Sequence, residues 1–536
     1  MKVATEAGVP VFQRLRDGVR RLSGWRRAGL AFVTGAISVL AFAPFHAFPI
    51  LFLTLPVLVW LIDSARSPRD AAVAGWWYGF GFFLLNLFWI GEAFLVEAEK
   101  FAWLLPFAVT LLPAGIALFW SAAIALCKYF WRSDWSRVLV LAGIMAAVEW
   151  LRGHVLTGLP WDVLGYALTY PLTLMQSAAL FGVYALGVPA VVIFALPLVI
   201  VADAPQPSAK THLTAAVIAL APLMLLQAYG AWRLGSNPPR DVAGIQLRIV
   251  QPSVPQREKW QPDKQREIFE QHLAMSVTNT QGVRDDLKGV THVIWPEAAM
   301  PFLPLEHPEA LQAIGLMLPP GTSLIAGALR RDVFEGGQKG YNSIMAFDDT
   351  GRLVATYDKI HLVPFGEYLP FEPVMSAIGL SKLTRGLGSF DTGSLPRKPI
   401  AVPGLPPVGG LICYEVLFPG AVIDDAHRPQ LLVNVTNDGW FGDTSGPRQH
   451  FHQARVRAVE EGLPLIRAAN NGISAVIDPL GRIKGYAGLN QKAVIDAGLP
   501  EAIEVTVYGT YRDWVLLGLE LILLVILLLK WSPRQA

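Results

Sequence analysis

Residues 409–415 read Gly-Gly-Leu-Ile-Cys-Tyr-Glu, and the fold can be worked out from this stretch. Four small or apolar residues lead into a cysteine, and a carboxylate follows two positions later. Such a run is typical of a short buried strand that ends in a sharp turn, where one side chain projects above the sheet. The chain has 2 cysteines, so Cys413 does not belong to a disulfide framework. We therefore interpret Cys413 as a candidate nucleophile.

The same pattern recurs on both sides of that stretch. Short apolar runs typical of buried strands alternate with longer polar runs that have helical spacing. The strand-like runs include Leu247–Val250, His292–Trp295, Ser323–Ala328, Ser343–Phe347, Val408–Ile412, Leu431–Val435 and Ala475–Ile477, and the helical runs include Asp263–Asn279 and Gln449–Glu461. Strands that alternate with helices and hairpins predict a layered α/β sandwich for this part of the chain.

The composition of the whole chain is that of a membrane protein. Of 536 residues, 53% are hydrophobic and 16% are charged, whereas about 25% are charged in a typical soluble domain. The net charge of +2 gives no reason to expect a nucleic-acid partner. A chain of this length is also too long for one ordinary core, so two or more domains are expected.

Hydrophobic segments are concentrated before and after the α/β part. We predict seven spans before it, near residues 28–44, 50–65, 71–95, 102–130, 137–152, 171–201 and 213–232, and an eighth at Trp514–Lys530. The predicted organisation is a basic N-terminus at 1–27, a seven-span membrane domain at 28–233, an α/β domain at 234–511, and a last transmembrane helix with a short tail at 512–536.

Lysine and arginine lie mostly on one side of the predicted spans. The side of the N-terminus holds Arg26, Arg27, Arg66, Arg69, Lys128, Arg132, Arg137, Lys210, Lys530 and Arg534, and the opposite short loops hold Lys100 and Arg152. Because positive loops stay in the cytoplasm, the α/β domain is predicted to face outward. A signal peptide cleaved after Ala43 is the alternative for the first apolar run, but its charged region would be long and Pro44 would follow the cut.

Two further candidates for acid–base chemistry, Glu297 and Lys359, stand at the ends of strand-like runs, as Cys413 does. A thiol attacks a carbonyl carbon only as the thiolate. A partly desolvated carboxylate can accept the thiol proton, and an ammonium group can stabilise both the thiolate and the negative oxygen of a tetrahedral intermediate. Residues of these types are usually surface charges, so the hypothesis depends on the motifs around them.

Those motifs are specific. They are WPEAAMP (295–301), GYNSI (340–344), YDKIHLVPFGEYLP (357–370), LICYEVLFP (411–419), NVTNDGWFGDTSGPRQH (434–450) and RAVEEGLPLIRAANNGIS (457–474). In these surroundings, Glu297, Lys359 and Cys413 resemble the catalytic residues of the nitrilase, or carbon–nitrogen hydrolase, superfamily. Membrane spans that flank an outward-facing domain of this kind are similar to those of the bacterial apolipoprotein N-acyltransferase family. The resemblance covers nearly the whole chain.

The resemblance implies a polytopic α-helical membrane domain with about eight spans and a nitrilase-like αββα sandwich. It makes Glu297 the general base, Lys359 the stabiliser of the oxyanion and the thiolate, and Cys413 the nucleophile. Further residues follow from the same resemblance: Glu367 and Glu415 as acids that line or support the site, Tyr414 as the donor of a backbone N–H, and Trp260 as a substrate-lining residue, for which an interfacial position is the alternative.

The implied activity is N-acylation of the N-terminal S-diacylglyceryl-cysteine of apolipoproteins. A membrane phospholipid is the acyl donor, the diacylglyceryl-apolipoprotein is the acceptor, and a thioester on Cys413 is the intermediate. The resemblance also implies a multi-pass protein of the bacterial inner membrane whose catalytic domain lies on the periplasmic side. We expect a monomer with no cofactor. We also expect no metal site, because His450 and His452 lie two positions apart without a nearby third ligand.

Two other functions fit parts of the sequence. A membrane-tethered amidase of the nitrilase type, acting on a small amide, would use the same three residues. A transporter with an inactive appendage would need a charged relay through the spans, which we do not find. An apolar segment rich in proline and glycine favours a lipid substrate, because it can form a lid at the membrane surface. Its apolar residues are Phe365, Leu369, Phe371, Met375, Leu380, Leu383, Leu387 and Phe390.

Overall fold

The computed structural model describes residues 10–335, 337–377 and 389–530, with the side chains of 374–376 also outside the description. Contacts divide the chain into two compact units. The first, the helical unit, comprises Met1–Phe88, Pro106–Asn237 and Val507–Ala536. The second, the α/β unit, comprises Trp89–Leu105 and Pro238–Thr506. The α/β unit therefore includes a short segment that the sequence placed among the spans.

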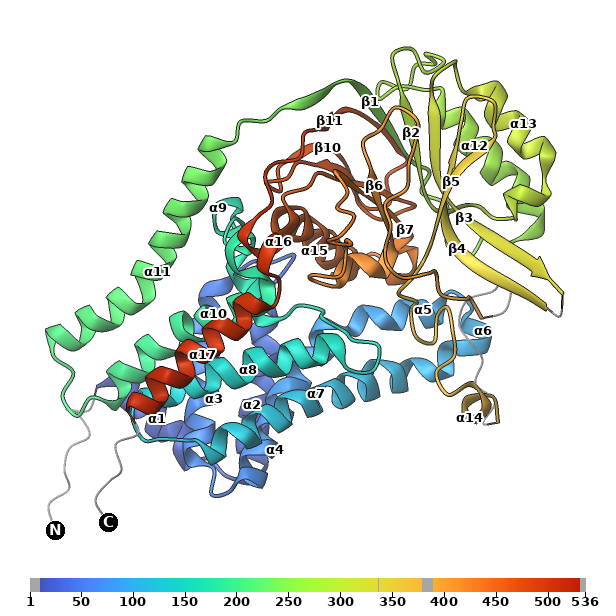
Figure 1. The fold of residues 1–536 in the computed structure, drawn as a ribbon. Coiled ribbons are helices and arrows are strands. Elements are labelled where there is room, and N and C mark those ends of the chain that lie inside the picture. Colours follow the sequence, from blue (N-terminus) through green and yellow to red (C-terminus); the bar gives the residue numbers. More distant parts are fainter. Residues whose placement is uncertain (1–9, 336, 378–388, 531–536) are drawn as a thin grey trace, which may run out of the picture. The chain divides into compact units, whose positions relative to one another are not determined.

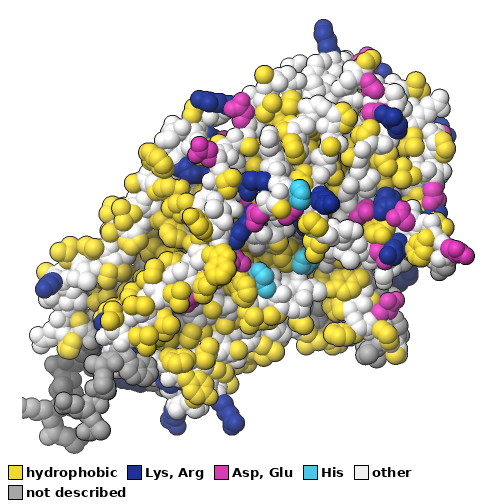
Figure 2. All heavy atoms as spheres, viewed as in Figure 1, with side chains coloured by type: hydrophobic (Ala, Val, Ile, Leu, Met, Phe, Trp, Pro, Cys, Tyr) yellow, Lys and Arg dark blue, Asp and Glu magenta, His cyan; other side chains and the backbone are white. Residues whose placement is uncertain are grey.

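The helical unit is built from helices (Figure 1), most of which are apolar. They are α1 Val11–Arg21, α2 Gly24–Ser38, α3 Leu51–Ser64, α4 Pro68–Asn86, α7 Leu105–Tyr129, α8 Ser136–His154, α9 Leu172–Met175, α10 Ala178–Asp203, α11 Ala209–Ser236, α16 Val507–Tyr511 and α17 Trp514–Leu529. Glycine lets α2 and α4 touch: a Cβ at Gly35 would lie 1.9 Å from the Tyr78 carbonyl oxygen, and one at Gly81 would lie 2.1 Å from that of Phe32. On the face drawn in Figure 2, hydrophobic side chains dominate these helices.

Three helical stretches among the described residues are long and apolar enough to cross a membrane: Ala98–Tyr129, Ala178–Asp203 and Ala209–Ser236. A fourth candidate is the pair Pro68–Asn86 and Phe88–Leu95, which bends by 56°. Phe48–Ser64 and Trp514–Leu529 are apolar but shorter. The helix α8 carries Arg137, Glu149 and Arg152, which reduces its apolarity. Length and composition thus support three or four spans, fewer than the eight predicted.

Two β-sheets form the centre of the α/β unit. The first has the order β11-β1-β2-β3-β4-β5 and the second the order β10-β9-β8-β7-β6. The strands of the first sheet are β1 Asp241–Gln251, β2 His292–Met300, β3 Ser323–Phe334, β4 Gly337–Phe347, β5 Leu353–Asp358 and β11 Ala493–Pro500. Those of the second are β6 Val408–Ile412, β7 Leu431–Thr436, β8 Leu465–Ala469, β9 Ser474–Ile477 and β10 Ile483–Ala487.

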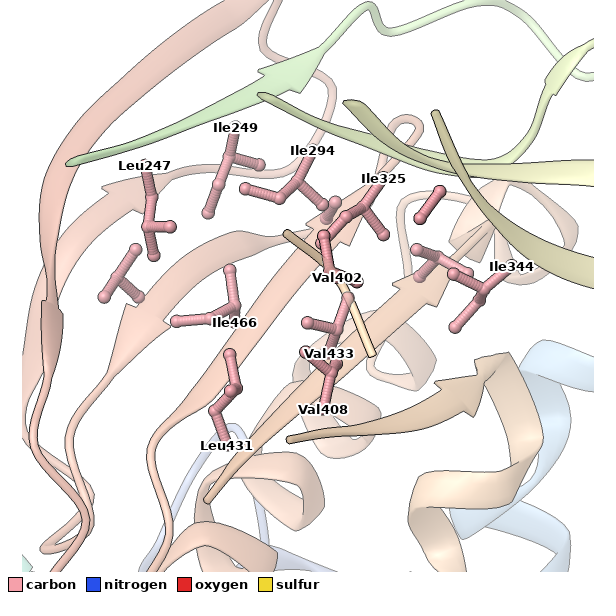
Figure 3. Close-up of a cluster of buried hydrophobic side chains, with 14 of the residues drawn as sticks. Leu247, Ile249, Ile294, Ile325, Ile344, Val402, Val408, Leu431, Val433 and Ile466 are labelled. Carbon is pink, nitrogen blue, oxygen red and sulfur yellow. The ribbon is translucent and has the colours of Figure 1, made fainter. Parts of the chain in front are cut away.

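The sheets pack face to face through apolar side chains from both (Figure 3). Alternation along each strand sends neighbouring residues to opposite faces. Ile294 of β2 therefore joins the core between the sheets, whereas Trp295 joins the core under α12 (Gln265–Ser276) and α13 (Pro308–Met317). The first sheet is covered on its outer face by these helices, and the second packs against α15 (Gly446–Glu461) (Figure 1). This arrangement confirms the predicted layered α/β sandwich.

Two sets of three parallel strands and one hairpin determine where the site forms. The strands β1, β2 and β3 run parallel, as do β6, β7 and β8. Parallel strands end at the same edge of a sheet, and loops at that edge commonly carry ligand-binding residues. The strand β5 returns antiparallel to β4, and its last residue, Asp358, pairs with Ser343. Lys359 follows directly.

Candidate active site

Cys413 lies at the turn that ends β6. Its backbone has a positive φ of 48°, which is uncommon for a residue with a side chain, and a 3₁₀ turn, η9 (Cys413–Leu417), begins there. The glycine before this turn has a steric reason: a Cβ at Gly410 would lie 2.8 Å from the ring of Tyr357. Cys413 itself is 6% exposed. The sharp turn expected from the sequence is present.

Glu297 lies within β2, where the strand irregularity begins. The next residue, Ala298, has a positive φ of 45°, and Asn342 Nδ2 donates a 2.7 Å hydrogen bond to Glu297 Oε1. Burial raises the pKa of the Glu297 carboxyl, and the nearby Glu367 carboxylate adds to this, while Lys359 and Asn342 act against it. A carboxyl with a raised pKa is suited to accept a proton near neutral pH.

Lys359 is held on two sides. Its backbone N–H donates a 2.8 Å hydrogen bond to the Asn342 carbonyl oxygen, and its Nζ lies 2.8 Å from Glu367 Oε2. Burial works to lower the pKa of this ammonium, but the charges of Glu367, Glu297 and Cys413 outweigh burial and raise the pKa above its ordinary value. Lys359 is therefore a permanent positive charge that interacts with both other members of the trio.

Burial raises the pKa of the Cys413 thiol to about 12. The Glu297 carboxylate contributes to this rise in pKa, whereas Lys359 and a hydrogen bond from the side chain of Thr436 oppose it. The resting sulfur is therefore a thiol, and it needs a base to remove its proton at the moment of attack. Glu297 is the carboxylate that interacts most strongly with it.

The two supporting carboxylates predicted from the sequence occupy different surroundings. Glu367 accepts hydrogen bonds from Asn342 Nδ2 (2.9 Å) and from the Val363 N–H (2.8 Å), in addition to pairing with Lys359. It therefore belongs to the same cluster as Glu297. The segment between Lys359 and Glu367 is folded back on itself by this carboxylate.

Glu415 is surrounded by donors. It accepts hydrogen bonds from the Tyr357 hydroxyl (2.8 Å), from the N–H groups of Ile360 (2.9 Å) and Ile412 (2.8 Å), and from Arg397 Nη2 (3.0 Å). Burial would raise its pKa, but Arg397 and these donors hold the pKa below its ordinary value. Glu415 thus connects the segment after β5 to the turn at Cys413 and remains ionised.

Tyr414 and Trp260 are half-buried. The ring of Tyr414 packs edge-on against Phe418 and His361, and its backbone is part of the turn η9. Of the predicted lid residues, Phe365 and Phe371 are exposed, while Leu369 and Phe390 are buried. Leu380, Leu383 and Leu387 lie outside the described residues, as does the side chain of Met375.

Four buried residues in this region were not assigned to the active site by sequence reasoning, although His450 was considered and rejected as a metal ligand. Asn342 bridges the two carboxylates, and Lys259 Nζ donates a 2.8 Å hydrogen bond to the main-chain carbonyl of Glu297. His450 and Asp438 contact the backbone of the nucleophile in series. His450 Nε2 lies 3.2 Å from the Cys413 carbonyl oxygen, and His450 Nδ1 lies 2.9 Å from Asp438 Oδ1. The motifs GYNSI and NVTNDGWFGDTSGPRQH contain three of them, so position within a motif was the available signal.

Within the described ranges, no group of three or more histidine, cysteine, aspartate or glutamate side chains is placed to hold a metal ion. His450 instead contacts Asp438, which Arg467 also contacts at 2.8 Å. The side chains of Glu297, Cys413 and Lys359 are of the types that can perform proton transfer, nucleophilic attack and stabilisation of negative charge, respectively.

Family models match both parts of the chain. The model of the family described as carbon-nitrogen hydrolase matches residues 243–506, and that of the apolipoprotein N-acyltransferase N-terminal domain matches residues 34–196. Among solved structures, a carbon-nitrogen hydrolase from Helicobacter pylori G27 is 16% identical, covers 51% of this chain and 94% of its own, and has a TM-score of 0.35. That score is too low to add to the family assignment.

Curated relatives match over the whole length. An apolipoprotein N-acyltransferase from Rhodopseudomonas palustris is 42% identical, with 98% of each chain covered. One from Bradyrhizobium diazoefficiens is 44% identical over 94% of this chain and 95% of its own. The chain belongs to the apolipoprotein N-acyltransferase family.

Proposed function

We propose that the chain transfers a fatty acyl group from a membrane phospholipid to the N-terminal amine of an S-diacylglyceryl-cysteine on an apolipoprotein. The family supports the reaction class and both substrates. The observation that carries the proposal is the position of Cys413 at a turn with φ of 48°, where the charges of Glu297 and Lys359 both influence the pKa of its thiol. The acyl group is held as a thioester between the two half-reactions.

In the first half-reaction, Glu297 accepts the proton of Cys413 as the sulfur attacks the ester carbonyl carbon of the phospholipid. The negative oxygen that forms is stabilised by the Lys359 ammonium and by the Tyr414 backbone N–H. The tetrahedral intermediate then breaks its carbon–oxygen bond, and Glu297 returns the proton to the departing oxygen. A lysophospholipid leaves, and the acyl group remains on the sulfur.

In the second half-reaction, the lipoprotein amine attacks the thioester carbonyl carbon, and Glu297 accepts the proton that the nitrogen loses. Breakage of the carbon–sulfur bond releases the amide, and the thiolate regains its proton from Glu297. Water competes with the amine for the same thioester. In this proposal, Trp260 and the lid residues Leu369 and Phe390 provide apolar surroundings that favour the amine by excluding water.

Glu367 and Glu415 support the site in this proposal rather than exchanging protons. Glu367 keeps Lys359 charged, and Glu415 fixes the turn that carries Cys413. The number of donors around Glu415 favours this role, because its lone pairs are already engaged.

The proposal places the enzyme as a monomer in the bacterial inner membrane. It has eight spans, with the membrane domain at 28–233, the catalytic domain at 234–511 on the periplasmic side, and the last helix and tail at 512–536. The excess of lysine and arginine on the N-terminal side supports this orientation. Both substrates reside in the bilayer, which gives a reason for tethering the catalytic domain there.

Intact mass spectrometry tests the first half-reaction. The purified protein is incubated with phospholipid vesicles, beside Cys413→Ala and the control Cys127→Ala, which removes the other cysteine, buried in α7. We expect a fatty-acyl mass increment on the wild type and on Cys127→Ala, and none on Cys413→Ala. A folded wild type that gains no mass from any phospholipid would contradict the proposal and favour the alternative, a membrane-tethered amidase.

A further inference from the structure

Lys259 is a buried lysine beside the proposed base, and the mechanism above gives it no part. It is 2% exposed, and its Nζ donates a 2.8 Å hydrogen bond to the main-chain carbonyl of Glu297. Burying an ammonium group is costly unless its surroundings compensate. The hydrogen-bond partner here is a neutral carbonyl, in contrast to Lys359, which pairs with Glu367. The position of Lys259 therefore calls for an explanation.

The contact of Lys259 fixes the backbone at an unusual point. The residue after Glu297, Ala298, has a φ of 45°, a conformation that persists only where its surroundings enforce it. The neighbouring strand β3 leaves no room for adjustment, because a Cβ at Gly327 would lie 2.5 Å from Glu297 Cα. Asn342 holds the Glu297 carboxylate and Lys259 holds its carbonyl, so both ends of the residue are constrained.

The charge of Lys259 has a second consequence. Glu297 must be ionised to accept the thiol proton, yet burial and the Glu367 carboxylate both raise its pKa. The charge of Lys359 is shared with Glu367 through their 2.8 Å ion pair. Lys259 is a second cation, and it lowers the pKa of Glu297. Burial lowers its own pKa to about 8, against the opposing charges of Glu297 and Cys413.

We propose that Lys259 is a positioning residue that fixes the Glu297 backbone and keeps the Glu297 carboxylate ionised in the resting enzyme. The inference rests on the proposed function, because it assigns Glu297 the role of base. The charged or titratable groups around this pair are His272 on α12, Lys359 and Glu367 after β5, and Cys413 on η9. Burial lowers the pKa of His272 to about 4, so it stays neutral near pH 7.

The test measures the rate at which iodoacetamide alkylates Cys413 as a function of pH, in full-length protein that carries Cys127→Ala. Lys259→Met removes the charge and the donor with little change in volume, and Lys259→Gln removes the charge but keeps a donor. We expect the acid limb of the profile to move up by about one pH unit in both variants, with a rate near pH 7 about tenfold lower. Unfolding would instead expose Cys413 and give the pH profile of a free thiol, with a pKa of about 8.5, so the folded state of each variant is checked by its Tm.

Lys264→Met is the matched control, because Lys264 lies five positions away on the surface and pairs with the exposed Glu267. Its profile should match that of the parent protein. An unchanged acid limb in both Lys259→Met and Lys259→Gln would overturn the inference. A wild type that fails to gain an acyl group from phospholipid would reject the proposed function. Alkylation needs no lipid, so the position of the acid limb would still test the role of Lys259.

Discussion

Glu297 and Glu367 accept hydrogen bonds from the same amide nitrogen: Asn342 Nδ2 lies 2.7 Å from Glu297 Oε1 and 2.9 Å from Glu367 Oε1. Two carboxylates held so close raise each other's energy when both are ionised. The amide donors of Asn342 and the ammonium of Lys359 compensate for that repulsion. Asn342 therefore sets the spacing between the proposed base and the carboxylate that holds Lys359.

Replacement of Asn342 by aspartate should disable this arrangement. Asn342→Asp would place a third carboxylate where a donor is needed, which raises the pKa of Glu297 and removes hydrogen bonds to charged groups worth about 1.5–3 kcal/mol each. We expect the rate of acyl-enzyme formation at pH 7 to fall at least roughly 100-fold, in line with that energy. Asn279→Asp is the control, because Asn279 Oδ1 only accepts hydrogen bonds, from the N–H groups of Gln281 and Val283. Equal rates for Asn342→Asp and wild type would contradict the assignment.

Glu367→Gln should shift the pH dependence in the direction opposite to that of the Lys259 variants. The Glu367 carboxylate raises the pKa of Glu297, so its removal lowers that pKa and moves the acid limb of acyl-enzyme formation to lower pH. The maximum rate should also fall, because Lys359 loses the partner that holds it in place. The rate is measured from pH 5 to 9, beside Glu306→Gln at the surface pair with Arg331. An acid limb that moves to higher pH would contradict the prediction that the Glu367 carboxylate raises the pKa of Glu297.

Glu415→Gln should reduce stability and leave Arg397 buried without its ion pair. Loss of one partner of a buried pair costs about 3–5 kcal/mol, so the Tm of the full-length protein in detergent should fall by several degrees. The folded-state pKa of Glu415 lies below its unfolded value. Its stabilisation is therefore present above the unfolded pKa and is lost as the pH falls through the folded value, so the difference in Tm should shrink in acid.

The surface variant Glu267→Gln provides the comparison for that experiment, because Glu267 is 69% exposed in its pair with Lys264. Its Tm should match that of the wild type at every pH. A Glu415→Gln protein that melts with the wild type at pH 7 would mean that Glu415 contributes little to holding the turn.

The sequence predicted the α/β layers well where strands were continuous and apolar. Val408–Ile412 is both the predicted run and the observed β6, and the turn at Cys413 followed from it. The strand β8 was not predicted, because Pro464 precedes it and the buried Arg467 interrupts its apolar pattern. Burial of Arg467 is compensated by its ion pair with Asp438 and by hydrogen bonds to Asn434 and to the Ile473 carbonyl, and such long-range contacts cannot be seen in the sequence.

In the candidate site, too, some residues could be predicted from the sequence and others could not. The trio could be predicted because each member stands in a distinctive motif at a strand end. Lys259 was overlooked because its neighbour Trp260 attracted the functional interpretation, and a lone lysine in a polar segment reads as a surface charge. The eight apolar stretches counted in the sequence exceed the three or four spans that helix length and composition support among the described residues. The stretch near 71–95 illustrates why: α4 ends at Asn86, and the residues from Trp89 onward contact the α/β unit, as the 2.8 Å hydrogen bond from Arg257 to the Leu95 carbonyl shows.

The discharge of an acylated enzyme tests the central claim most directly. Protein first acylated on Cys413 by phospholipid is freed of lipid and then mixed with a diacylglyceryl-cysteine peptide, with an N-acetylated copy of the peptide, or with buffer, and its mass is followed with time. Transfer predicts that the acyl increment leaves the protein and appears on the free amine of the first peptide, while the other two samples keep it. Loss of the increment at the same rate in all three samples would contradict the account and identify water as the acceptor.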